Sequence, residues 1–257
     1  MKKQTQRDPA TSGGGAFLRK IEAAALPGIL TRLLRKKENA EPVNATIVID
    51  PGHGGDADTG GSGANHAVSC SGVLEKNMTL QLGLLLRDAL ETAATEGGHQ
   101  IKIVLTRETD VNLSLADRAG VAKDNRADRF LSLHFNGCNK VMRGTETYIR
   151  SRADNVNLAA DKKFARRIQR AAFGALKKHD RTSRDRKVRE GKLGVLSDVS
   201  LGNTDGDKKC RACLLELDFI DVEAVDQLLN VNPNAAAVRA DVAKALAEAI
   251  IADLQNP

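Results

Sequence analysis

The chain has 257 residues, of which 41% are hydrophobic, and it carries a formal net charge of +6. This length suffices to bury one sizeable core, and no stretch supplies the roughly 18 consecutive apolar residues that a membrane span needs. Aromatic residues make up only 3% of the chain and tryptophan is absent, so stacking platforms for single-stranded nucleic acid are scarce and no nucleic-acid partner is expected.

Residues 1–44 form a basic N-terminal extension, with nine Lys or Arg against four Asp or Glu. A polar tail ends in a glycine triplet at 13–15, and two short amphipathic helical pieces follow over 16–38, interrupted by Pro27 and Gly28. This segment is expected to dock on protein, with a membrane surface as the alternative. No apolar core of a Sec signal follows the first lysines.

From residue 45 onward, apolar strands alternate with amphipathic helices. The pattern predicts strands at 46–50, 101–106, 129–135, 144–150, 193–197 and 212–219, and helices at 75–93, 114–125, 155–178 and 234–254. Ser114 is the expected N-cap of the second of these helices. Such alternation indicates an α/β fold, a mostly parallel central sheet with helices on both faces, in a single domain over 45–255.

Polar side chains stand where the predicted strands end. His53 follows the first strand, His134 and Glu216 come late in two others, and Glu75 begins the first long helix. Because the carboxyl ends of parallel strands meet at one edge of a sheet, these four side chains are candidates for one cluster. Taken singly, each histidine has an ordinary interpretation as a hydrogen-bonded surface residue, and Glu75 as a favourable acid in a first helical turn.

Two imidazoles and a carboxylate suit Zn²⁺, because three protein ligands leave one position for a water that becomes a hydroxide source. The glycines around His53 would let its imidazole approach an ion closely. Glu216 lies in an apolar strand, where a buried carboxylate is costly without a partner. A carboxylate outside the ligand set could act as the general base.

Other reactive residues carry weaker signals. The remaining histidines, which have no strand-end context and are predicted to be exposed, are His66, His99 and His179. The cysteines are Cys70, Cys138, Cys210 and Cys213. The last two have the C-x-x-C spacing of a redox or zinc pair, so reduced structural thiols, a disulfide and a metal or redox role all stay open.

Six motifs in order resemble the zinc-dependent N-acetylmuramoyl-L-alanine amidases of the Amidase_3 type. They are "IVIDPGHGG", "GVLEKNMTLQLGLLLRDAL", "LTRETD", "SLADRAGVAKDNRADRFLSLHFN", "GTETYI" and "LLELDFID", and the resemblance spans roughly 45–253. It implies that His53, Glu75 and His134 bind one Zn²⁺ and that Glu216 is catalytic. The implied reaction is cleavage of the amide between the lactyl group of N-acetylmuramic acid and the L-alanine of the peptidoglycan stem.

The resemblance also frames several secondary expectations. Glu146 of "GTETYI" is expected to face outward, with a role as a second acid as the alternative. Arg107 and Arg118 are expected to form structural ion pairs rather than substrate contacts. The loops at 54–74 and 197–213 are longer than is usual in the family and are expected to border the cleft.

The expected substrate lies in the periplasm or cell wall, while no Sec signal is visible, so delivery by a secretion system or holin-assisted release is predicted. This favours a bacteriolytic effector or lysin, with an immunity or delivery protein as a candidate partner. Two other functions stay open. One is an amidase-like module that binds peptidoglycan without hydrolysing it, and the other is a zinc peptidase that hydrolyses a bond within the stem peptide.

Overall fold

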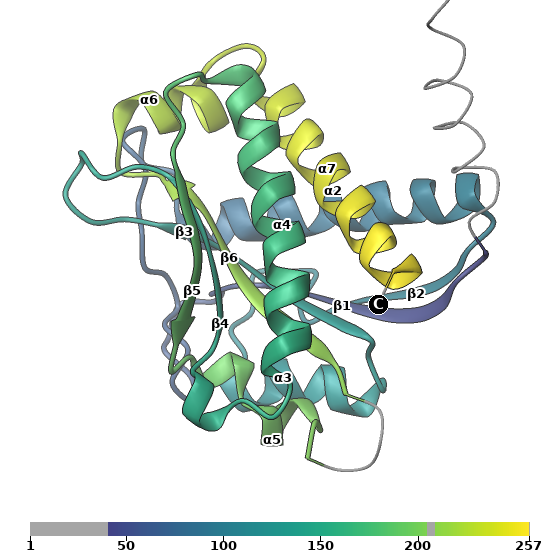
Figure 1. Ribbon diagram of the computed structural model, residues 1–257. Helices are drawn as coiled ribbons and strands as arrows, with labels where there is room; N and C mark the ends of the chain where they lie inside the picture. The colour runs from purple at the N-terminus through teal and green to yellow at the C-terminus, as the bar shows by residue number, and fades with distance from the viewer. Residues whose placement is uncertain (1–40, 205–208, 257) are drawn as a thin grey trace, which may run out of the picture. The chain divides into compact units, whose positions relative to one another are not determined.

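A six-stranded sheet organises the part of the chain that the computed structural model describes, residues 41–204 and 209–256. Its strand order is β2-β1-β3-β6-β4-β5 (Figure 1). The strands are β1 (Asn44–Pro51), β2 (Gln100–Leu105), β3 (Arg129–Asn136), β4 (Thr145–Arg150), β5 (Asp185–Gly191) and β6 (Arg211–Phe219). All neighbouring pairs are parallel except β4 and β6, which are antiparallel. The predicted α/β fold with a mostly parallel sheet is confirmed.

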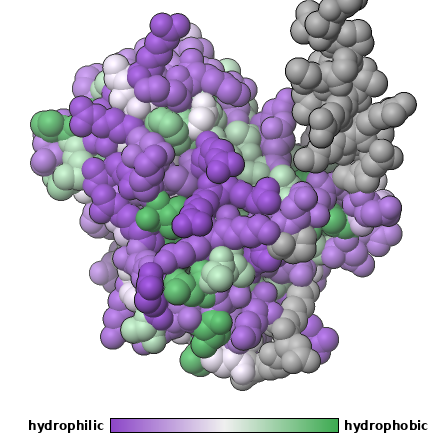
Figure 2. All heavy atoms as spheres, in the orientation of Figure 1, coloured by the Kyte–Doolittle hydropathy of each residue, from purple (hydrophilic) through white to green (hydrophobic). Residues whose placement is uncertain are grey.

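Helices cover both faces of this sheet (Figure 1). One layer consists of α2 (Glu75–Gly97), α4 (Leu158–His179) and α7 (Ala235–Gln255), and the opposite layer contains α3 (Leu115–Asp124) and the short α5 (Asp198–Leu201). The remaining turns are α6 (Glu223–Asp226), the π-helix η3 (Gln227–Val231) and the 3₁₀ helices η1 (Arg152–Asp154) and η2 (Gly194–Leu196). In Figure 2 the outward surface over α4 is mostly hydrophilic, as expected of an amphipathic helix whose apolar stripe faces the sheet.

The central strands are buried on both faces, which explains their continuous apolar runs. Ile47 and Ile49 of β1 pack under the larger helix layer, whereas Val48 packs under α3. Successive side chains of a strand point to opposite faces, so a strand covered on both sides needs apolar residues at every position. The strand β1 therefore runs through the core, and its carboxyl end lies at the edge of the sheet where the parallel strands end.

Two secondary-structure predictions have distinct outcomes. Ser114 caps α3 as predicted, since its Oγ accepts a hydrogen bond from Asp117 N at 3.0 Å. The strand predicted at 193–197 is wrong, because residues 194–196 form η2, whose Val195 and Leu196 pack into the core beneath α3. The strand that the sequence did not predict is β5. It lies at the edge of the sheet, where a strand can be mostly charged and needs no apolar run.

The basic extension predicted over 1–44 lies almost wholly outside the described residues, as does its helical segment 16–38. Across residues 41–204 and 209–256, no helix has both the length and the apolar character required to cross a membrane.

Candidate active site

The turn after β1 places His53 in an unusual conformation. His53 has φ +60°, and Gly54 and Gly55 follow at φ +130° and +61°. A positive φ is uncommon at a residue with a Cβ, and such residues tend to cluster at functional sites. The Nδ1–H of His53 donates to Gly63 O at 2.9 Å, so the other ring nitrogen, Nε2, points to the centre of the site.

Glu75 occupies the first residue of α2 and is buried between the two histidines. Its Oε1 lies 3.2 Å from His53 Nε2 and 3.2 Å from His134 Nδ1. The backbone N–H of Phe135 donates to the same oxygen at 3.0 Å, and Ala67 N donates to Oε2 at 2.9 Å. Although burial favours the neutral carboxyl, the hydrogen bonds and positive charge of the two imidazoles outweigh it and lower the pKa of Glu75.

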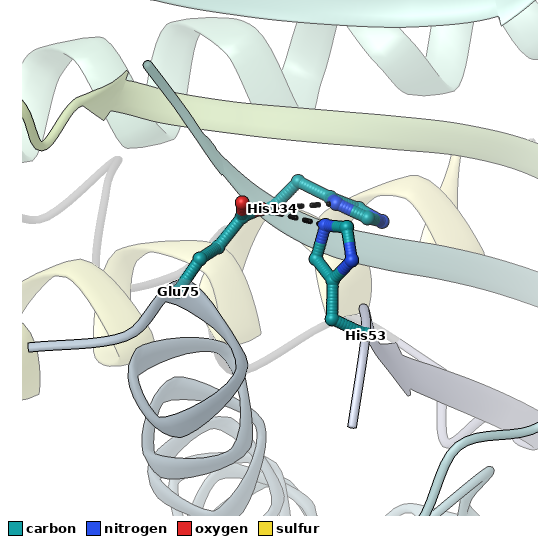
Figure 3. Close-up of side chains that lie close together, drawn as sticks. All are labelled: His53, Glu75 and His134. Atoms are coloured by element: carbon teal, nitrogen blue, oxygen red, sulfur yellow. Dashed lines mark hydrogen bonds and ion pairs between the residues drawn. The ribbon is translucent and has the colours of Figure 1, made fainter. Parts of the chain in front are cut away.

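The ligand atoms of His53, Glu75 and His134 all lie within 4.8 Å of one another. Figure 3 shows the three side chains converging from a strand end, a helix start and a neighbouring strand. Gly52 makes this approach possible, since a Cβ at that position would lie 2.3 Å from the His134 ring. Two imidazoles and one carboxylate at this spacing match the donor set that zinc takes in hydrolytic sites.

Glu216 joins the same cleft from β6, where it lies level with His134 of β3 in the parallel pairing. Its Oε2 is buried and has no hydrogen-bond partner among the described residues. Burial, then the negative charges of Glu75 and Glu146, raise the pKa of Glu216 well above its ordinary value. A carboxylate in such an environment has the basicity of a proton acceptor.

The cleft that contains these residues has a volume of about 410 Å³. Its walls include Asn136 of β3, Tyr148 of β4, Leu193 and Gly194 at the start of η2, and Ser62 and His66 from the long loop between β1 and α2. The expectation that the first long loop borders the cleft is therefore confirmed. Sequence reasoning did not single out Asn136 or Tyr148, whose position depends on which strands become neighbours.

The other histidines differ from one another. His66 is exposed as predicted, yet its Nδ1 lies 4.0 Å from Glu75 Oε2 and its ring stacks on that of His53 with centroids 6.4 Å apart. His179 is exposed, whereas the prediction is wrong for His99, which is half-buried because its Nδ1 accepts a hydrogen bond from Val43 N at 3.3 Å. His66 lies between His53 and Glu75 in the sequence, and this position could have indicated that it lies in the cleft.

The expectation that Glu146 faces outward is wrong. Its side chain is buried because β4 pairs with β6 in the antiparallel direction and sets Glu146 directly opposite Glu216. Its carboxylate is satisfied by Arg186 Nε at 2.7 Å and Arg189 Nε at 3.0 Å. Nothing in a single strand's alternation specifies which neighbour that strand acquires.

Two buried arginines stabilise the turn that carries His53. Arg118 forms the expected ion pair, with its Nη1 2.9 Å from Asp50 Oδ1, and also donates to His53 O. Arg107 instead donates to the carbonyl oxygens of Pro51 and Gly52. Burial and the nearby Arg118 charge lower the pKa of Arg107 to about 10. The predicted ion pair is confirmed for Arg118, whereas the prediction is wrong for Arg107, whose guanidinium binds backbone carbonyl oxygens instead of a carboxylate.

None of the four cysteines, all of which lie in the described residues, forms a disulfide. Cys210 and Cys213 are buried, and burial raises the pKa of Cys213 well above its usual value, which makes it inert. Cys70 and Cys138 are exposed. Of the alternatives, the structure agrees with reduced thiols.

Two histidines and a glutamate that could hold a metal ion stand at the carboxyl edge of this α/β sheet beside a second glutamate, an arrangement that suits a hydrolase. Residues 47–252 match the Amidase_3 family model, described as N-acetylmuramoyl-L-alanine amidase, and the chain belongs to this family.

The chain is similar to two proteins of Bacillus subtilis. The uncharacterized protein YqiI of Bacillus subtilis is 32% identical over 174 residues, which cover 67% of this chain and 74% of YqiI. The sporulation-specific N-acetylmuramoyl-L-alanine amidase of the same organism is 42% identical over 103 residues, covering 40% of this chain and 35% of that relative. Thus the match spans only about a third of the named amidase.

Among solved structures, the catalytic domain of CwlV, an N-acetylmuramoyl-L-alanine amidase from Bacillus (Paenibacillus) polymyxa var. colistinus, is similar with a TM-score of 0.60. It is 26% identical, and the similarity covers 81% of this chain and 97% of that domain.

Proposed function

We propose that this chain is a zinc-dependent N-acetylmuramoyl-L-alanine amidase that acts on cell wall peptidoglycan. It would hydrolyse the amide that joins the lactyl group of N-acetylmuramic acid to the L-alanine of the stem peptide. The observation that carries the proposal is the cluster of His53, Glu75 and His134, with ligand atoms within 4.8 Å, beside Glu216 in one cleft of an Amidase_3 chain.

Three features support a zinc ion held by these residues. The donor set is that of hydrolytic zinc sites. The bond from His53 to Gly63 O orients that ring, as outer partners of metal-binding histidines do. The absence of a side chain at Gly52 leaves room for the His134 ring. A zinc ion bound here would polarise the lactyl carbonyl and lower the pKa of a water molecule.

Glu216 performs the proton transfers in this mechanism. Its carboxylate accepts a proton from the attacking water, and the same carboxyl group then donates that proton to the alanine nitrogen as the carbon–nitrogen bond breaks. The products are the lactyl carboxylate and a stem peptide with a free amino terminus. Glu75 would take part as the carboxylate, because a metal ligand must be deprotonated.

The architecture supports a catalytic domain over 45–255 that follows the basic extension 1–44. A bacteriolytic role, as an effector or lysin, extends the proposal. When exported to the periplasm of a Gram-negative host, the wild-type chain should lyse cells, and the Glu216→Ala chain should not.

Digestion of purified sacculi tests the activity. Wild-type protein should release intact stem peptides from the glycan strands, identified by mass spectrometry, whereas Glu216→Ala should retain its zinc and release none. Fragments cut within the stem would indicate a zinc peptidase. Zinc without any soluble product from the wild-type protein would indicate a peptidoglycan-binding module and refute the amidase proposal.

A further inference from the structure

Two arginines of β5 share one buried carboxylate beside the cleft. Arg186 Nε donates to Glu146 Oε2 at 2.7 Å, and Arg189 Nε lies 3.0 Å from the same oxygen. The other oxygen, Oε1, accepts hydrogen bonds from Asn136 Nδ2 at 2.9 Å and from the Tyr148 hydroxyl at 3.1 Å. Both oxygens of Glu146 are therefore occupied by protein donors.

This cluster lies next to the proposed catalytic glutamate. Glu146 is directly opposite Glu216 in the pairing of β4 with β6, and Tyr148 is level with Arg189 in the pairing of β4 with β5. Residues level with each other on neighbouring strands project to the same face of a sheet. Tyr148 and Glu216 both line the cleft, and Arg189 is the neighbour of Tyr148 on the β5 side.

The cluster carries more positive charge than Glu146 can neutralise. Within residues 41–204 and 209–256, no second carboxylate forms an ion pair with either guanidinium. The Arg186 side chain is 24% exposed and that of Arg189 is 45% exposed, so both reach solvent. One arginine would suffice to pair with Glu146, and the second adds a further positive charge to the cluster.

The geometry of both side chains suits an incoming anion. Each guanidinium contacts Glu146 through Nε, which leaves its terminal nitrogens for the planar two-bond recognition of a carboxylate. Arg186 is held further by the Phe219 ring, whose centroid lies 5.2 Å from its Cζ. Because Glu146 and the Phe219 ring already hold the Arg186 guanidinium, this side chain loses little conformational entropy when an anion binds.

We propose that Arg186 and Arg189 form a subsite for a stem-peptide carboxylate and select stems in which the α-carboxyl group of the second residue is a free acid rather than an amide. This inference rests on the proposed function. The second residue of a stem is linked through its side-chain carboxyl group, so its α-carboxyl group is the nearest anion to the scissile bond. Amidation of this α-carboxyl group removes its negative charge. It also replaces an oxygen acceptor by an NH₂ donor, which cannot accept a hydrogen bond from a guanidinium.

Two N-acetylmuramoyl tripeptides test the selection, identical except that the second residue carries either a free α-carboxylate or an α-carboxamide. The wild-type enzyme should hydrolyse the acid with a kcat/KM about tenfold higher, which corresponds to about 1.4 kcal/mol. Arg186→Gln and Arg189→Gln should each reduce this ratio toward one, mainly by slowing the acid. Arg189→Lys, which keeps the charge without the fork, should retain part of the preference.

Lys187→Gln is the matched control, since Lys187 lies between the two arginines but pairs with Asp185 instead. It should keep the wild-type ratio. Equal hydrolysis of both tripeptides by the wild-type enzyme, or an equal slowing of both by Arg189→Gln, would overturn the subsite.

Calorimetric binding of both tripeptides to Glu216→Ala separates this inference from the proposed activity. Tighter binding of the acid, lost in the Glu216→Ala/Arg189→Gln double variant, supports the subsite even if neither tripeptide is hydrolysed by the wild-type protein. In that case the amidase proposal alone would fail. Equal binding of acid and amide would refute the subsite.

Discussion

Replacing Gly52 by alanine should disable the cluster of His53, Glu75 and His134 while leaving the sheet intact. An added Cβ would lie 2.3 Å from Cε1 and Nε2 of His134, whereas ordinary contact begins at 3.4 Å. The imidazole must therefore withdraw by about 1 Å, the difference between these distances. The backbone of Gly52 lies outside the left-handed region, so alanine adopts it without strain of its own.

A displacement of this size is large for a metal ligand, since ligand distances tolerate only about 0.2 Å. We expect Gly52→Ala to weaken zinc binding by at least about 100-fold, because perturbing even the outer partners of a ligand costs about 10- to 100-fold. Crowding against the ring should lower the free energy of unfolding by about 1–3 kcal/mol. Competition with a chromophoric chelator measures the affinity, and urea denaturation of the metal-free protein measures the stability.

Gly120→Ala is the matched control, because Gly120 lies in α3 and a Cβ there meets nothing within 4 Å. It should keep the wild-type zinc affinity and gain about 0.5–1 kcal/mol of stability from the lower flexibility of the unfolded chain. Undiminished zinc affinity in a folded Gly52→Ala protein would refute the reasoning, since His134 would then be either unconstrained by this contact or no ligand at all.

Further measurements test a buried ion pair, a helix cap, a buried carboxyl group and the bound metal. Arg118→Met strands the buried Asp50 carboxylate, so urea denaturation should show a loss of about 3–5 kcal/mol; a loss below 1 kcal/mol would contradict the ion pair's role. Ser114→Ala should cost about 1 kcal/mol in the same assay through loss of the helix cap, and an unchanged midpoint would contradict it. Burial raises the pKa of Asp161 to about 7. The native protein therefore retains a proton that the unfolded chain releases near its ordinary pKa of 3.8, and stability should fall as the pH rises from about 4 to 7. Asp161→Asn should flatten this dependence, and a slope equal to that of the wild-type protein would refute the assignment. Removing zinc with a chelator should lower Tm. If free zinc had been at 1,000 times its Kd, the free energy of unfolding should fall by about 4 kcal/mol. An unchanged Tm would argue against a bound ion.

The sequence predicted the centre of the fold because local pattern and burial agree there. A run such as Ile47 to Ile49 is apolar at every position, which only a strand covered on both faces requires. Once the sheet is parallel, the ends of its strands share an edge, and this accounts for the proximity of His53 and His134. Glu75 follows from the same topology, because α2 begins near that edge and returns along the sheet.

Prediction failed where the surroundings of a segment, rather than its own pattern, decide its structure. The apolar residues Val195 and Leu196 suggested a strand, but a 3₁₀ turn buries them equally well against the helix layer that contains α3. The strand β5 has the opposite character, since an edge strand can carry charged side chains at almost every position. Hydrophobic periodicity alone does not distinguish these cases.

The error at Glu146 has the same origin and bears on function. Alternation along β4 puts Glu146 and Tyr148 on one face, but whether that face is solvated depends on the strand beside it and on that strand's direction. In this protein the neighbour is β6, and its antiparallel pairing sets Glu146 against Glu216. A buried carboxylate there needs cationic partners, and the charged residues that made β5 unrecognisable as a strand supply them. The feature that defeated prediction is therefore the one from which the proposed carboxylate subsite is built.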